Sequence, residues 1–100
     1  MHGKVARYRL KPSMEAKLLE FEREVREEKM PGCVAEFMFR MDAEPFVCFE
    51  AVIFESKEAH FPVADSPRQQ TLYQKFVELL EGEPEWHDGE VIHANPTLQT

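Results

Sequence analysis

The sequence has few of the residues that several common protein classes need. Its 100 residues include only 4 glycines, 2 cysteines and 12 lysines and arginines. None of the glycines forms a glycine-rich phosphate loop, which is the motif that commonly holds flavin and nicotinamide nucleotides. The formal net charge of -7 argues against binding a nucleic-acid backbone, because that requires clustered lysine and arginine. No apolar run is long enough to span a bilayer.

The two cysteines, Cys33 and Cys48, are predicted to lie on paired strands but not opposite each other. A disulfide needs closely spaced Cβ atoms, so two free thiols are expected. The N-terminal residues 1–4 lead directly into a strand-like pattern without the apolar core of a signal peptide. These features together predict a cytoplasmic protein.

The residues that are present suit one small globular domain over residues 1–100. The hydrophobic share is 43%, and aromatic residues make up 11% of the chain. A chain of this length buries only a modest core, so oligomerisation is a natural supplement to its stability.

Hydrophobic periodicity and turn residues predict the helices and strands. Apolar residues alternate or run continuously in the strands and recur at helical spacing in the helices. Ser13 and Ser66 are the predicted N-caps of the two long helices, and Ser66 is followed by Pro67 and by Gln69 as a capping box. The predicted strands are 5–10, 33–41, 46–54 and 90–93; the predicted long helices run from Ser13 to the Met30-Pro31-Gly32 stop and from Ser66 to Gly82, and a short helical stretch covers 56–61.

This order predicts an α+β fold of the ferredoxin-like βαββαβ type. A four-stranded antiparallel sheet would have its first and third strands in the centre and both long helices on one face. Val5, Val34, Val52 and Phe54 are expected on the other face, where they would form an apolar surface too large to leave in water. We therefore expect a homodimer in which one sheet packs against another.

Several segments, in this order and spacing, resemble the antibiotic-biosynthesis monooxygenase family of dimeric α/β barrels almost from end to end. The resemblance implies a pocket between the sheet and the helices of each subunit. It also implies a link to cofactor-independent oxygenases that act on quinols and polyketides. Haem-degrading members carry an Asn and a Trp where this chain has Ala6 and Phe54, so haem degradation is not implied. The segments that carry the resemblance are Leu10-Lys11-Pro12, Met30-Pro31-Gly32, Phe54-Glu55-Ser56-Lys57-Glu58-Ala59, Ser66-Pro67 and Leu79-Leu80-Glu81-Gly82.

Glu50 is a candidate catalytic residue, because it interrupts an otherwise apolar central strand. Burying a lone carboxylate is costly and raises its pKa, as a general base near neutral pH requires. The alternative is an ion pair with Arg7 or Arg9 on the neighbouring strand, or with Arg40 on the hairpin partner.

His60 is the second candidate catalytic residue. Many members of the family place a histidine shortly before the Ser-Pro of the second long helix, where this chain has Val63, and His60 lies one turn earlier. An imidazole at the mouth of the expected pocket could transfer a proton near neutral pH. The alternative is an exposed histidine with no catalytic role.

Four aromatic residues, Tyr8, Phe37, Phe49 and Tyr73, are predicted to line an apolar substrate pocket, although a packed core would explain them equally well. His2, His60, His87 and His93 have no partners at metal-ligand spacing, so no metal site is expected. We expect no flavin, haem or metal cofactor.

Two functions remain open from the sequence. The first is a cofactor-independent oxygenase that acts on a small aromatic or quinol-like metabolite and supplies orientation, a base and exclusion of water. The second is a non-catalytic small-molecule binder or structural dimer of the same fold. A polar group at the floor of a cavity favours the enzyme, and a filled cavity favours the binder.

Overall fold

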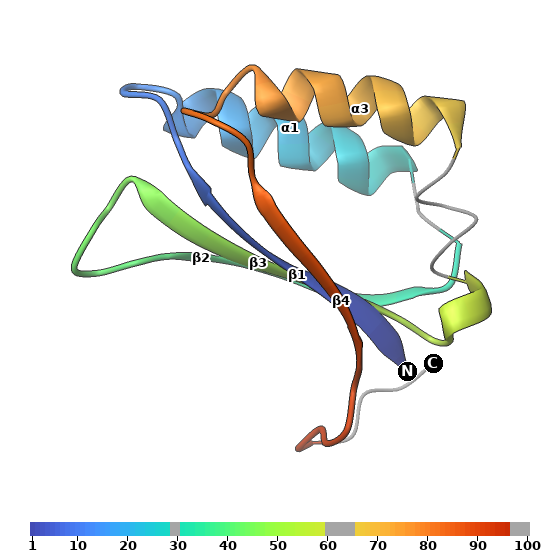
Figure 1. Cartoon of the computed structure of the whole chain (residues 1–100). Coiled ribbons are helices and arrows are strands. Elements are labelled where there is room, and N and C mark those ends of the chain that lie inside the picture. Colours follow the sequence, from blue (N-terminus) through green and yellow to red (C-terminus); the bar gives the residue numbers. More distant parts are fainter. Residues whose placement is uncertain (29–30, 60–65, 97–100) are drawn as a thin grey trace.

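The computed structural model describes residues 1–28, 31–59 and 66–96, and consists of a four-stranded antiparallel sheet with two helices on one face (Figure 1). This is the predicted βαββαβ arrangement. In the part of the chain that the structure describes, no helix is both long and apolar enough to cross a membrane. The elements are β1 (His2–Arg9), α1 (Glu15–Glu28), β2 (Cys33–Arg40), β3 (Val47–Phe54), α3 (Pro67–Val77) and β4 (Glu85–Glu90), with one helical turn at 57–59.

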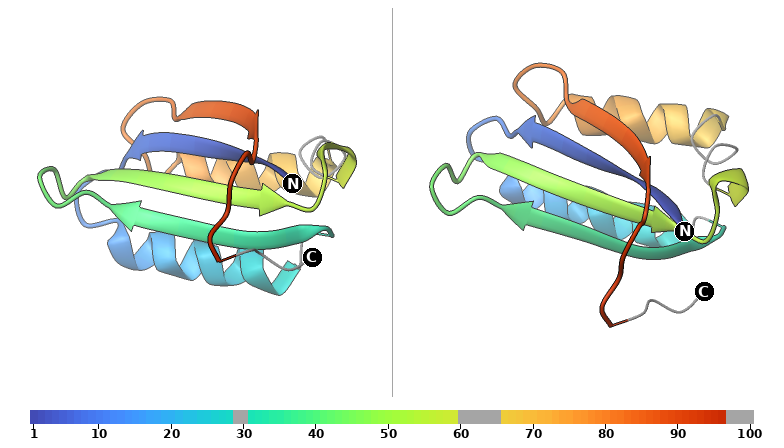
Figure 2. Two further views of the ribbon diagram at one scale, coloured as in Figure 1. Left: turned by 90° about the horizontal axis from the view of Figure 1, so that it is seen from below. Right: turned by 60° about the horizontal axis from the view of Figure 1, so that its bottom comes forward.

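The strands lie in the order β2-β3-β1-β4, so the predicted central position of β1 and β3 is confirmed (Figure 2). In the ladder between β1 and β3, Ala6 pairs with Glu50 and Tyr8 with Cys48. Paired residues point to the same face of a sheet, and successive residues point to opposite faces. These four side chains are buried and therefore share the face that the helices cover.

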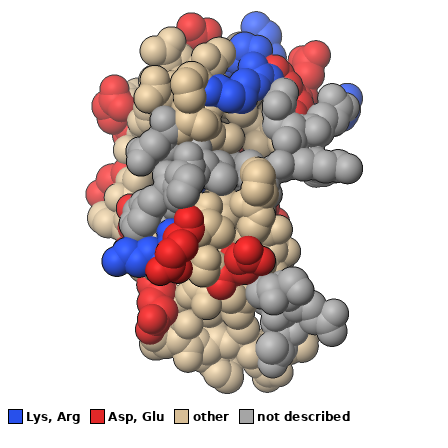
Figure 3. All heavy atoms as spheres, turned by 90° about the vertical axis from the view of Figure 1, so that its right-hand side faces the viewer, with Lys and Arg blue, Asp and Glu red and all other residues tan. Residues whose placement is uncertain are grey.

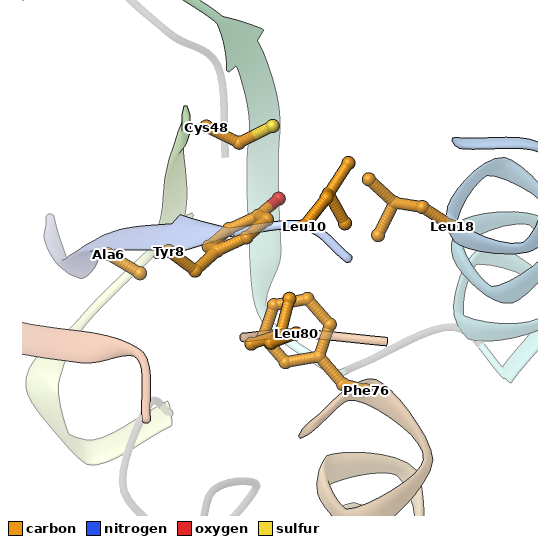
Figure 4. Close-up of a cluster of buried hydrophobic side chains, with 7 residues drawn as sticks. All are labelled: Ala6, Tyr8, Leu10, Leu18, Cys48, Phe76 and Leu80. Atoms are coloured by element: carbon orange, nitrogen blue, oxygen red, sulfur yellow. The ribbon is translucent and has the colours of Figure 1, made fainter. Parts of the chain in front are cut away.

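The core forms where this face meets the helices (Figure 4). The Tyr8 ring contacts the Phe76 ring edge to face, with 4.9 Å between the ring centroids, and Phe21 of α1 stacks on the same Phe76 at 5.8 Å. Leu72 and Phe76 of α3 are buried, and so is Leu80, which follows the helix and bridges to Leu10. The two helices are thereby fixed over the centre of the sheet.

The predicted N-cap of α3 is confirmed, and that of α1 is wrong. The Ser66 hydroxyl oxygen accepts a hydrogen bond from the Gln69 backbone N–H at 3.2 Å, and Pro67 occupies the first helical position. Ser13 instead has a φ of 66°, which places it in the turn before α1, and the helix begins at Glu15. The predicted stop after α1 is supported by Gly32, whose φ of 77° favours glycine.

The last strand lies earlier in the chain than predicted. A strand is predicted at 90–93, but β4 covers Glu85–Glu90, with Asp88 opposite Lys4 and Gly89 opposite Gly3. The strand is at the edge of the sheet, and five of its six residues are exposed. Its sequence therefore lacks an apolar run. Backbone pairing with β1 defines it instead.

The face of the sheet opposite the helices carries different residues from those expected. Val52 and Phe54 were predicted to lie there, but they are buried on the helix side, because β3 keeps them in phase with Glu50. Val5 is on the outer face as predicted, and Val34 lies in a bulge of β2. The large apolar side chains exposed beside Val5 on this outer face are Phe37, Phe39 and Phe49.

Among the described residues, Glu50 is the one buried charged group, and the other charged groups are at least partly exposed. On the side seen in Figure 3, the described acidic side chains are interspersed with basic ones, and the latter form no continuous basic patch. Ion pairs of this kind include Arg9–Glu44, Arg40–Glu15 and Lys75–Glu24. Exposed pairs contribute little to stability, so the fold depends on the core rather than on these charges.

We predict that Cys33 and Cys48 are both free thiols. In the hairpin, Cys33 is opposite Phe54 and Cys48 is opposite Arg40, so the two lie at opposite ends of β3, about 20 Å apart at 3.3 Å per residue. A disulfide cannot span that distance. Thiol titration of the denatured protein without reductant should find both, and in the native protein Cys48 should react slowly because burial raises its pKa. Recovery of no thiol after denaturation would contradict the observed strand register.

Candidate functional site

A small cavity lies between the sheet and the two helices, where the family resemblance implies a pocket. Its volume is about 80 Å³, which is room for two or three water molecules at about 30 Å³ each. Apolar side chains from both helices form much of its wall, among them Phe21, Leu72 and Phe76. The charged or hydrogen-bonding residues in the lining are Lys4, Glu22, Glu36, Glu50, Gln69, Tyr73 and Trp86.

Glu50 supplies a buried carboxyl group to this cavity. Only 7% of the residue is exposed, and its neighbours across the strands are Ala6 and Met38. Loss of hydration on burial is the main cause that raises the pKa of Glu50 from 4.5 to about 7, and the negative charge of Glu36 adds to it. At neutral pH, Glu50 is therefore divided between its acid and its carboxylate form.

Glu36 is the carboxyl group next to Glu50 at this cavity. Its negative charge and a side-chain hydrogen bond between the two both raise the pKa of Glu50, while the charge of Lys4 lowers it. Glu50 is the buried one of the two and Glu36 is exposed, so Glu50 is the group that can release or take up a proton within the cavity.

Glu22 from α1 completes a group of three carboxyls. Oxygen atoms of Glu22, Glu36 and Glu50 all lie within 4.8 Å of one another, a spacing that a hard cation such as Mg²⁺ or Ca²⁺ could use. Acidic side chains often gather in this way without an ion, so the cluster by itself does not identify a metal site.

The arginines considered as partners of Glu50 lie elsewhere. Arg9 pairs with Glu44 at 3.5 Å and Arg40 forms an ion pair with Glu15. Arg7 is exposed and is opposite Phe49, which places it on the outer face of the sheet. The alternative explanation of Glu50 as half of an arginine ion pair is therefore wrong for all three.

Tyr8 lies beneath the cavity and not in its lining. The residue is 2% exposed, and among the described residues its hydroxyl group has no hydrogen-bond partner. Burial and the charge of Glu50 raise the pKa of Tyr8, so it remains a neutral phenol. In Figure 4 its hydroxyl points towards Cys48, and the residue belongs to the hydrophobic core beside the site.

Lys4 and Trp86 were not predicted as site residues. The Lys4 ammonium lies 4.7 Å from the centre of the Trp86 ring, close enough for a cation–π contact. Trp86 also packs against Tyr73 and Phe76, at 6.4 and 6.2 Å between ring centroids. The alternation of Lys4, Ala6 and Tyr8 in β1 was the available sequence signal for Lys4, whereas Trp86 was hidden by the misplaced last strand.

The remaining predicted site residues have different outcomes. Tyr73 lines the cavity and is 40% exposed, in keeping with the predicted place near its mouth. Phe37 and Phe49 were expected in the same pocket, but the structure places them on the outer face, because each is one residue out of phase with Glu36 or Glu50. His60 lies outside the described residues, so its role stays a prediction.

Comparison with known proteins shows the fold. No family model and no curated protein matches the sequence, whereas many solved structures match the fold. One is a point mutant of SnoaB, a cofactor-independent oxygenase from Streptomyces nogalater, with a TM-score of 0.81, 12% identity and coverage of 96% of this chain and 97% of that one.

Two further solved structures agree with this result. An antibiotic biosynthesis monooxygenase has a TM-score of 0.73 at 15% identity, over 93% of this chain and 100% of that chain. A conserved protein from Methanosarcina mazei Go1 has a TM-score of 0.77 at 17% identity, over 88% and 89%. The predicted likeness to antibiotic-biosynthesis monooxygenases is thus confirmed at the level of the fold.

Proposed function

We propose that the protein is a cofactor-independent oxygenase that acts on a small aromatic or quinol-like metabolite, with Glu50 as its general base. The observation that carries the proposal is Glu50 itself, a buried carboxyl at a cavity with a pKa of about 7. General bases are most effective when their pKa lies near the working pH. The shared fold with an oxygenase described as cofactor-independent supports the same reaction class.

In this mechanism, Glu50 removes the acidic proton of a phenol or of an activated carbon, and the electron-rich anion then reacts directly with dioxygen. Dioxygen is the oxidant. When an activated methylene is oxidised, one oxygen atom stays in the product as a carbonyl and the other leaves as water with the two hydrogens of that carbon. The protein contributes the base, the orientation of the substrate and exclusion of bulk water.

The test is oxygen consumption with a panel of hydroquinones and anthrone-like phenols. We expect kcat/KM to rise with pH through about 7 and then to level off, because Glu50 acts as a base only when it is ionised. Mass spectrometry with labelled dioxygen should find one labelled oxygen atom in the product. No uptake of oxygen with any member of the panel would contradict the proposal.

A second function, a non-catalytic small-molecule binder or structural dimer, is favoured by the size of the cavity. About 80 Å³ is less than the roughly 150 Å³ of an engineered cavity that admits benzene, so the cavity as it stands does not enclose an aromatic ligand. Trp86, the single tryptophan of the chain, provides a fluorescent probe inside the site. A change in its emission without oxygen uptake would identify a binder.

We further propose that the protein is a homodimer formed through the outer faces of two sheets, and that it resides in the cytoplasm, where Cys33 and Cys48 stay reduced. The outer face carries Phe37, Phe39 and Phe49, which are 49%, 53% and 38% exposed. Contact with a second copy would remove this apolar surface from water. The segment after β4 crosses below the same face, and its Ile92 is 91% exposed (Figure 2).

A further inference from the structure

Lys4 is the one lysine or arginine among the described residues that line the cavity. Its side chain leaves β1 on the same face as Ala6 and Tyr8, and its neighbours across the strands are Val52 and Asp88. The Trp86 ring, 4.7 Å from the ammonium group, restricts where that group can lie. A positive charge is therefore held at the margin of a cavity that otherwise contains three carboxyl groups.

Proton removal by Glu50 would leave a negative charge on the substrate, and the Lys4 ammonium group is placed to stabilise it. The O–H bond of the substrate breaks, an O–H bond to the Glu50 carboxylate forms, and the negative charge moves from Glu50 to the substrate oxygen. Glu22 and Glu36 line the same cavity and would oppose that charge when they are ionised. A cation fixed at the same cavity stabilises the anion without having to reorganise during the reaction.

We propose that Lys4, positioned by the ring of Trp86, binds the oxyanion of the substrate, and that the pocket therefore selects molecules with an ionisable hydroxyl group, such as phenols, enols and hydroquinones, over their neutral ethers. This inference rests on the proposed function, because it assigns the ligand class of the same site. It names a specificity residue from β1 that acts through its charge.

Other ionisable groups lie in or next to the same cavity, and they set the sign of the expected effects. The acidic ones oppose an anion, and Lys4 must act against them. In the wild type, the Lys4 charge also lowers the pKa of Glu50, so removing that charge should raise it. The groups in the lining are Glu22 on α1, Glu36 on β2, Glu50 on β3 and Tyr73 on α3. Tyr8 on β1 lies outside the lining, and Asp88 on β4 is opposite Lys4.

The experiment measures binding of 4-nitrophenol, whose neutral and ionised forms differ in visible absorption, by absorption and by Trp86 fluorescence. The variants are Lys4→Met, which removes the charge from a side chain of similar length, and Lys4→Arg, which keeps it. Lys17→Met is the matched control, because Lys17 is exposed on α1 and does not line the cavity. The neutral ether 4-nitroanisole is the matched ligand.

We expect wild type, Lys4→Arg and Lys17→Met to bind the ionised probe about tenfold or more tightly than Lys4→Met does, with no such difference for 4-nitroanisole. The apparent pKa of the bound probe should be lower than that of the free probe, except in Lys4→Met. Equal affinity of wild type and Lys4→Met for the anion would overturn the inference, and so would failure of the wild type to bind the probe.

The outcome is separable from that of the oxygenase proposal. Binding that depends on Lys4 in a protein that never consumes oxygen would remove the oxygenase and leave the anion site. Oxygen uptake in which Lys4→Met leaves both kcat/KM and its pH profile unchanged would do the reverse. If both proposals hold, the rise of kcat/KM with pH should move to higher pH in Lys4→Met and stay in place in Lys17→Met.

Discussion

Replacing Glu50 with glutamine is expected to slow oxygen uptake by about a hundredfold or more and, in the same variant, to make the fold more stable above neutral pH. Glutamine has nearly the shape of glutamic acid but cannot accept a proton at physiological pH. The catalytic loss follows from the absence of a base at the cavity. The gain in stability follows from the cost of burying the charge of Glu50, which is only 7% exposed.

The direction of the stability effect depends on the raised pKa of Glu50. A carboxyl whose pKa rises from 4.5 when unfolded to about 7 when folded holds its proton more tightly in the folded state. Its contribution is fully present below pH 4.5 and is lost as the pH rises through about 7. That shift corresponds to about 3 kcal/mol, which the wild type forfeits above neutral pH and the glutamine variant retains.

Urea denaturation of both proteins at an acidic and an alkaline pH measures this difference, since the other ionisable groups largely cancel in the comparison. Glu36→Gln is the matched control, because Glu36 is the neighbouring carboxyl at the same cavity. It should keep its activity, and its rise of kcat/KM should move to lower pH, because the charge and the hydrogen bond of Glu36 both raise the pKa of Glu50. Full oxygen uptake by Glu50→Gln would remove Glu50 from the mechanism.

Glu50 could be found from the sequence because a charge within an apolar strand is a local signal. Its neighbours in the cavity could not be predicted in this way. Glu22, Glu36 and Lys4 come from α1, β2 and β1, and only the crossing of the helix and the strand registers bring them to one cavity. No spacing along the chain predicts that side chains from these separate elements line the same cavity.

The wrong predictions for the outer face of the sheet have a related cause. The β3 sequence is apolar on both faces, so its alternation does not say which set of side chains faces the helices. Because successive side chains alternate, a Glu50 that points inward also places Val52 and Phe54 inward and Phe49 outward, so the predicted positions of these three residues are wrong. The α3 cap at Ser66 needed only local chemistry and was predicted correctly, whereas β4 is an edge strand that depends on pairing with β1.

The observed directions of the β3 side chains also decide which substitution tests the homodimer. A charge at Val52 was the natural choice while that residue was expected to point outwards, but Val52 is buried against the helix layer, so a charge there would damage the fold. Phe49 is on the outer face, is 38% exposed, and has Phe39 on one side and Arg7 on the other. Phe49→Glu is therefore the appropriate variant.

We expect Phe49→Glu to be a folded monomer. In a symmetric sheet-to-sheet dimer the substitution places two carboxylates in the contact, and burying each costs several kcal/mol without a partner. The dissociation constant should rise about a thousandfold or more. Light scattering at micromolar concentration measures the mass, and circular dichroism checks that the fold is kept. Leu19→Glu is the matched control, because Leu19 is an exposed apolar residue on α1, which covers the other face of the sheet, and its variant should remain a dimer. A wild type with the mass of a monomer would contradict the homodimer itself, and a Phe49→Glu variant that stays dimeric would show that the two subunits meet through another surface.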